Sequence, residues 1–120
     1  MFEIHPVDGD KSGILARKAG VELPVSAMML WENGEERGHI LYRIEGDRVE
    51  LLTIDCSDPD LAQWLIRGAL NAAANRAAVT AVCGNAALFS SLDGLGFVQK
   101  GDKYSLHIPD LFSRPCAGCC

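Results

Sequence analysis

The sequence predicts an α/β fold of the α+β kind, with a mixed, largely antiparallel sheet around a central pair of parallel strands. Residues 51–56 and 79–83 are short apolar strands separated by a long alanine-rich helix, an order that brings two parallel strands side by side. Turn dipeptides at residues 33–34, 46–47 and 101–102, each flanked by alternating apolar residues, predict antiparallel hairpins. The expected order of elements is β-α-β-β-β-α-β-α-β-β.

The N-terminal part is expected to supply an edge strand and one short helix. Residues 2–7 form the strand, and residues 11–19 form a helix that ends at Gly20, because glycine adopts the left-handed conformation without strain. Roughly twenty residues separate this strand from the next one, which leaves room for one helix only.

Residues 26–56 are predicted to form three consecutive antiparallel strands. Asn33-Gly34 suits a type I′ turn, and Gly46-Asp47 suits a type II′ turn, because both turns require positive φ angles. Alternate side chains along a strand point to the same side of the sheet. The sets expected to share a face are Ala27, Met29 and Trp31; Ile40, Tyr42 and Ile44; and Val49, Leu51 and Thr53.

The main helix is expected to begin with Asp58 as its N-cap and Pro59 at its first position. Proline disfavours helical geometry in the residue before it, and its missing N–H needs no partner in a first turn. The apolar stripe of this helix is expected to contain Leu61, Trp64, Leu65, Gly68, Ala69, Ala72 and Ala73. A broad stripe of mostly small residues predicts a helix that lies flat on a sheet.

The C-terminal part is expected to add a short helix and a last hairpin. The helix covers residues 86–92, and the hairpin joins residues 97–100 to residues 103–108. The predicted organisation is a single domain over residues 1–112, followed by a Cys-rich tail at residues 113–120.

The composition excludes several classes of function. A net charge of -5 with scattered Lys and Arg argues against a nucleic-acid surface, which needs a concentrated basic face. No apolar run approaches the roughly 20 residues that span a bilayer. The first residues lack a basic segment followed by an apolar one, so we expect no secretory signal and a cytoplasmic location.

The segment from residue 51 to residue 97 resembles the C-terminal half of the GNAT superfamily of N-acetyltransferases. The resemblance rests on the order strand, helix, strand, Asn85, second helix and Leu95-Gly96-Phe97. It implies an N-acetyltransferase that transfers the acetyl group of acetyl-CoA to a small-molecule or peptide amine. It also implies that the strand at residues 51–56 splays from the strand at residues 79–83, with acyl-CoA in the opening.

The resemblance also implies particular site residues. The backbone at the end of the first parallel strand, with Thr53, Ile54 and Cys56, would pair with the pantetheine arm, and Asn85 would contact the cofactor. Acetyl transfer needs a base that deprotonates the amine. Asp55 is the acidic residue at the carboxyl end of that strand and is the candidate catalytic base; the alternative is an ordinary strand-end carboxylate.

The sequence departs from the family pattern in the loop that binds the diphosphate of CoA. That loop is normally rich in glycine, so that backbone N–H groups at a helix start surround the phosphates. Here the junction reads Cys56-Ser57-Asp58-Pro59-Asp60. Asp58 would occupy a free N–H as N-cap, Pro59 has none, and the carboxylates would repel phosphate. The Gly68 that follows lies inside the helix, where a packing role is expected.

Two further departures concern catalysis and the acceptor. The position where the family often has a Tyr that protonates the departing thiolate is Leu92, and the neighbouring Ser90 and Ser91 are expected to be solvated. The short N-terminal segment predicts a reduced acceptor site, or one completed by a second subunit in a homodimer. The alternative function is therefore a non-catalytic GNAT-fold binding protein that has lost CoA pyrophosphate binding.

The remaining candidates for chemistry are cysteines and histidines. His5, His39 and His107 are expected to be surface residues, and no pair of them has metal-ligand spacing, so no metal site is predicted. Cys116, Cys119 and Cys120 resemble a zinc knuckle but lack further ligands within the chain. A terminus without metal is the favoured interpretation, and a thiol or metal-binding function is a third hypothesis.

Overall fold

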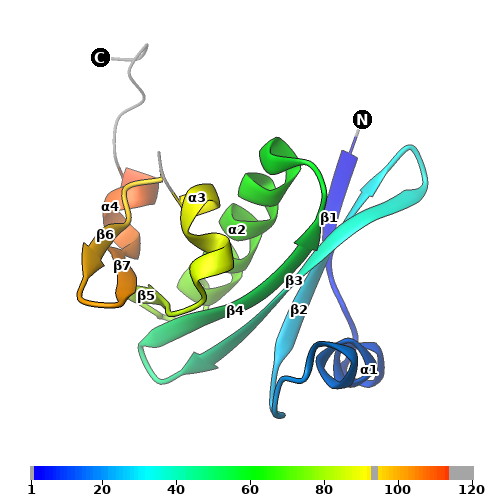
Figure 1. Cartoon of the computed structure of the whole chain (residues 1–120), viewed down its shortest axis with the longest axis horizontal. Helices are drawn as coiled ribbons and strands as arrows, with labels where there is room; N and C mark the ends of the chain where they lie inside the picture. The colour runs from blue at the N-terminus through cyan, green and yellow to red at the C-terminus, as the bar shows by residue number, and fades with distance from the viewer. Residues whose placement is uncertain (1, 93–94, 114–120) are drawn as a thin grey trace.

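A computed structural model of the chain describes residues 2–92 and 95–113, and this part folds around one seven-stranded mixed sheet (Figure 1). The strands are β1 (Phe2–Pro6), β2 (Ser26–Glu32), β3 (Glu35–Glu45), β4 (Arg48–Cys56), β5 (Thr80–Cys83), β6 (Val98–Lys100) and β7 (Lys103–His107). The helices are α1 (Gly9–Ala19), α2 (Pro59–Ala74), the 3-10 turn η1 (Ala86–Leu88), α3 (Phe89–Leu92) and α4 (Ile108–Ser113).

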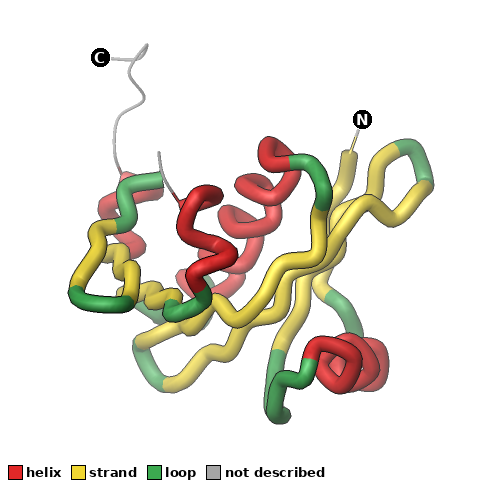
Figure 2. The backbone as a smooth tube through the Cα atoms, in the orientation of Figure 1, coloured by secondary structure: helices red, strands yellow, loops and turns green. Residues whose placement is uncertain are grey.

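The strands lie in the order β1-β2-β3-β4-β5-β7-β6, and only β4 and β5 are parallel neighbours within this described sheet. The predicted fold class is therefore confirmed. Helix α2 lies across one face of the sheet and α1 lies on the other (Figures 1 and 2). Each helix buries its own core: the larger core lies under α2, and a smaller one, around Ala16, Ala27 and Leu41, lies under α1.

The turn residues behave as their chemistry predicts. Asn33 and Gly34 have φ angles of 53° and 84°, which is the type I′ conformation expected for Asn-Gly. Gly46 and Gly101 also have positive φ angles, of 59° and 67°, and each opens its hairpin turn. Gly20 ends α1 in the left-handed conformation, with a φ of 72°, as expected.

A β-bulge corrects one of the predicted strand faces. Leu41 lies opposite Thr53 and Tyr42 lies opposite Leu51, so Leu52 is an extra residue in β4. An extra residue inverts the alternation of side chains beyond it. Val49 and Leu51 are in the core under α2, whereas Thr53 faces the α1 side, and the prediction that these three residues share a face was wrong at Thr53.

Helix α2 begins as predicted. Asp58 is its N-cap, Pro59 is its first residue, and the Asp58 side chain accepts a hydrogen bond from the backbone N–H of Asp60 at 2.9 Å. A Cβ atom on Gly68 would lie 3.1 Å from the side chain of Ile4, so this glycine lets β1 pack closely against the helix. Gly68 therefore has a packing role.

Trp64 does not belong to the buried stripe of α2, contrary to the prediction. Its side chain is 48% exposed and packs against Phe2, with ring centroids 5.6 Å apart. The buried face of α2 also includes Ala62, Ile66 and Leu70, so it is turned away from Trp64. The Trp64 ring covers Phe2 of the edge strand β1 instead of the sheet centre.

The C-terminal helix α4 was not predicted. The last strand ends at His107, and Ile108 begins a helical turn. The Ile108 side chain is 1% exposed and belongs to the main core. The Ile108 N–H donates a hydrogen bond to the Val79 carbonyl at 2.8 Å. Pro109 in the first turn was the available signal, since proline is tolerated there. The cysteines predicted for the tail lie outside the described residues.

No helix in the part of the chain that the structure describes has the length and apolar character needed to cross a membrane.

Candidate functional site

The two parallel strands separate part of the way along β4. Their pairing runs from Arg48 opposite Thr80 to Leu51 opposite Cys83, where β5 ends. Strand β4 continues to Cys56 and stays paired with β3 on its other side. Residues 53–56 therefore present an edge toward β5 without a strand partner in the described chain, so an extended ligand can reach their N–H and C=O groups.

Asn85 holds the point where the strands separate. Its side-chain N–H donates to the carbonyl of the bulged residue Leu52 at 2.9 Å, and its side-chain oxygen accepts the N–H of Ala87 at 3.0 Å. One side chain thus ties β4 to the turn that follows β5. Asn85 was predicted to contact a cofactor. Its side-chain oxygen accepts a hydrogen bond from within the protein, and a contact between Asn85 and a ligand stays a prediction.

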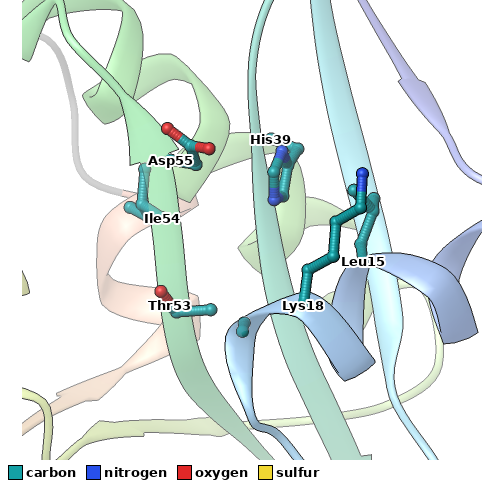
Figure 3. Close-up of a pocket in the computed structure, with 7 residues that line it drawn as sticks. Leu15, Lys18, His39, Thr53, Ile54 and Asp55 are labelled. Carbon is teal, nitrogen blue, oxygen red and sulfur yellow. The ribbon is translucent and has the colours of Figure 1, made fainter.

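A cavity of about 310 Å³ opens on the α1 side of the sheet beside the free end of β4 (Figure 3). Its lining residues are Leu15, Lys18, Ala19, His39, Thr53, Ile54 and Asp55. Asp55 and His39 are opposite each other on β4 and β3, so their side chains share this face. Figure 3 shows His39 between Asp55 on one wall and Lys18 of α1 on the other.

Three predicted site residues thus meet at this cavity, and two others were missed. Thr53, Ile54 and Asp55 line it, although the Ile54 side chain also packs against the main core. Cys56 packs against the main core without lining the cavity, and its thiol donates to the Asp58 carbonyl at 3.5 Å. His39 is half-buried in the cavity wall, although the sequence suggested a surface histidine. Lys18 gave no sequence signal, because its position depends on how α1 packs.

The start of α2 does not fit the diphosphate of CoA. The Asp60 N–H donates to the Asp58 carboxylate, Pro59 has no N–H, and the Ala62 N–H donates to the Asp58 carbonyl at 2.9 Å. The carboxylate of Asp60 adds a second negative charge to the first turn. A diphosphate needs several free N–H groups and positive potential, whereas this helix start carries two carboxylates, a proline without N–H and an Asp60 N–H that is already bonded.

Leu92 and Cys83 are core residues. Leu92 is fully buried and cannot give a proton to a leaving group. Burial raises the pKa of the Cys83 thiol above its ordinary value and so favours its protonated form. The thiol also donates a hydrogen bond to the backbone carbonyl of Asn85 at 3.7 Å. The described residues contain no group of three or more His, Cys, Asp or Glu that could hold a metal ion.

No protein-family model and no curated protein sequence matches this chain. Solved structures match it closely in shape. A protein from Desulfovibrio desulfuricans, described as an acetyltransferase of the GNAT family, aligns with a TM-score of 0.68 at 12% identity, over 90% of this chain and 99% of that chain.

Two further structures match over the same extent. The ribosomal-protein-S18-alanine N-acetyltransferase of Escherichia coli aligns with a TM-score of 0.68 at 14% identity, over 90% of this chain and 94% of that one. A Bacillus subtilis acetyltransferase in complex with CoA aligns with a TM-score of 0.65 at 12% identity, over 89% of this chain and 99% of that one. This protein therefore has the GNAT fold.

Proposed function

We propose that this protein is an N-acyltransferase that moves an acetyl group from a thioester donor to an amine. The observation that carries the proposal is the end of the β4–β5 pairing after Leu51 and Cys83, beside a cavity that contains a carboxylate. The free edge of β4 suits a donor that binds as an extended strand, and the cavity suits an acceptor.

The proposed roles follow from position. The backbone of residues 53–56 holds the extended donor and orients its carbonyl group. Asp55 attracts the ammonium group of the acceptor and takes its proton, since an amine attacks only in the neutral form. His39 lies across from Asp55 on β3 and is the second group in the cavity that can accept a proton.

The donor is held through its pantetheine arm rather than through a diphosphate. Asp58 and Asp60 give the α2 start two negative charges, and Pro59 has no N–H to offer a phosphate. Acetyl-CoA remains a donor in this proposal, but the nucleotide part adds no affinity. S-acetylpantetheine is expected to bind at least as tightly as acetyl-CoA, because the carboxylates at the α2 start repel the diphosphate.

A second candidate is the non-catalytic GNAT-fold binding protein. The acidic start of α2 favours it, together with the burial of Leu92 where a proton donor would be useful. Such a protein would use the free edge of β4 to bind a ligand without transferring an acyl group.

Thioester binding and thiol release separate the two candidates. Thermal unfolding with S-acetylpantetheine and acetyl-CoA measures binding, since a ligand at 100 times its dissociation constant adds about 2.7 kcal/mol. Release of free thiol with a panel of primary amines measures transfer. For an enzyme, Asp55→Asn is expected to lower transfer by about a hundredfold or more with donor binding unchanged.

Asp102→Asn, a substitution in the distant β6–β7 turn, is the matched control and is expected to keep full activity. Donor binding without thiol release from any amine would identify the non-catalytic candidate. Absence of binding by both thioesters would contradict the proposal.

A further inference from the structure

The cavity beside β4 contains two opposite charges that have no partner in the described chain. Asp55 is exposed on one wall and Lys18 is exposed on the other, and neither takes part in an ion pair among the described residues. The Arg43 and Glu50 side chains, by contrast, lie 3.5 Å apart on neighbouring strands. Within the described chain, an unpaired carboxylate and an unpaired ammonium group thus line the same cavity (Figure 3).

We propose that the acceptor is a small zwitterionic amine of amino-acid size, an inference that rests on the proposed function. Its ammonium group lies at Asp55, where the acyl group is delivered, and its carboxylate lies at Lys18. Leu15 and Ala19 of α1 supply an apolar wall for a short side chain. The volume of about 310 Å³ is at the lower end for ligand pockets, which run from about 300 to 1,000 Å³.

Lys18 is the residue that makes this proposal specific. A polyamine would bring a second cation to the wall that Lys18 occupies, and a protein lysine would bring no anion to it. A carboxylate at this wall gains a charge-assisted hydrogen bond from Lys18. Lys18 also lies in the last turn of α1, where any basic residue interacts favourably with the helix dipole. Arg17 shares that turn but does not line the cavity, so it provides a control.

Binding of three matched probes tests the inference without a donor. L-leucine carries both charges, L-leucinamide carries only the ammonium group, and 4-methylpentanoate carries only the carboxylate. Titration of the ¹⁵N-labelled protein is expected to shift the amides of Thr53 and Lys18. Leucine is expected to bind about threefold to fivefold more tightly than either single-charge probe, which is the upper part of the range for exposed ion pairs.

Two variants assign the charges. Lys18→Met is expected to remove the preference for leucine over leucinamide, and Asp55→Asn the preference for leucine over 4-methylpentanoate. Arg17→Met and Asp102→Asn keep both preferences. Leucine and leucinamide, the two probes that carry an amine, are then tested as acceptors with S-acetylpantetheine as the donor.

The outcomes separate this inference from the proposed function. Leucinamide bound and acetylated as well as leucine would overturn the zwitterion inference and leave acyl transfer intact. Selective leucine binding that depends on Lys18, without any transfer, would support the binding inference and overturn the enzymatic function. Binding of none of the three probes near the cavity would overturn the inference outright.

Discussion

The two halves of β4 have different surroundings, although they belong to one continuous strand. Residues 48–51 are paired on both sides, by β3 and β5, and Val49 and Leu51 are buried under α2. Residues 53–56 are paired on one side only and end beside the cavity. The bulge at Leu52 separates a half that is paired on both sides from a half whose other edge has no strand partner in the described chain.

One inserted residue changes both the pairing and the faces of a strand. Regular pairing outward from the Gly46-Asp47 turn would place His39 opposite Ile54 and would keep Asp55 on the face of Leu51. With the bulge, Asp55 lies opposite His39 on the α1 side. The candidate base therefore lies in a cavity rather than under α2.

The largest expected difference between the two halves is in stability. Leu51→Ala removes a side chain that is 1% exposed in the main core and is expected to lower the free energy of unfolding by about 3 kcal/mol. Thr53→Ala, in the one-sided half, is expected to cost less than about 1 kcal/mol. Urea denaturation of both variants measures this contrast. Equal losses would mean that the end of β4 is packed as tightly as its start.

A substitution at Gly38 tests the close contact between β3 and the end of β4, residues 53–56. A Cβ atom on Gly38 would lie 2.7 Å from the Asp55 carbonyl oxygen and 2.8 Å from the Cβ atom of Cys56, so the end of β4 must move. Gly38→Ala is expected to cost about 2 kcal/mol and to weaken thioester binding.

The matched control for Gly38 is Gly84→Ala, since a Cβ atom there meets the Lys103 side chain at an ordinary 3.7 Å. Thermal unfolding with and without S-acetylpantetheine measures both effects. If the two alanine variants bind the thioester equally, the donor does not depend on the position of the β4 end.

The smallest expected effect concerns the start of α2. Asp58→Asn combined with Asp60→Asn removes two negative charges but retains the N-cap, because Asn caps a helix as well as Asp does. Acetyl-CoA is expected to bind about threefold more tightly, and S-acetylpantetheine is expected to bind as before.

Calorimetric titration of the two thioesters measures the affinity of the double variant for each. The gain in affinity for acetyl-CoA is expected to shrink at high salt, because salt screens exposed charges. Asp102→Asn again serves as the control. Tighter binding of acetyl-CoA than of S-acetylpantetheine by the unsubstituted protein would contradict the idea that this helix start provides no diphosphate site.

Much of the fold follows from local chemistry that the sequence carries. Asn33-Gly34 and Gly46-Asp47 require positive φ angles, and Asp58-Pro59 is a helix start, because these preferences depend on the residues themselves and their nearest neighbours. The predicted helix at residues 86–92 is found as η1 followed by α3. The short helix α4 was missed because its stability comes from burying Ile108 in the core, not from its own sequence.

The candidate site is where sequence reasoning was least complete. The resemblance to the GNAT superfamily pointed to the end of β4, and Asp55 is the acidic residue at that carboxyl end. The cavity that Asp55 shares with His39 and Lys18 joins three elements, and no spacing in the sequence relates them. The roles of Asp55 and Asn85 toward a ligand stay predictions.

The sequence by itself determined the order of elements, the three hairpin turns, and the acidic, proline-containing start of α2, because each depends on local backbone preferences and charge. The tertiary structure alone decided the bulge at Leu52 and the packing of α1 against β3. These two features select which side chains face the cavity. The physical reason is that a bulge and a helix orientation are set by the packing of the whole sheet, in which residues far apart in the chain contact one another.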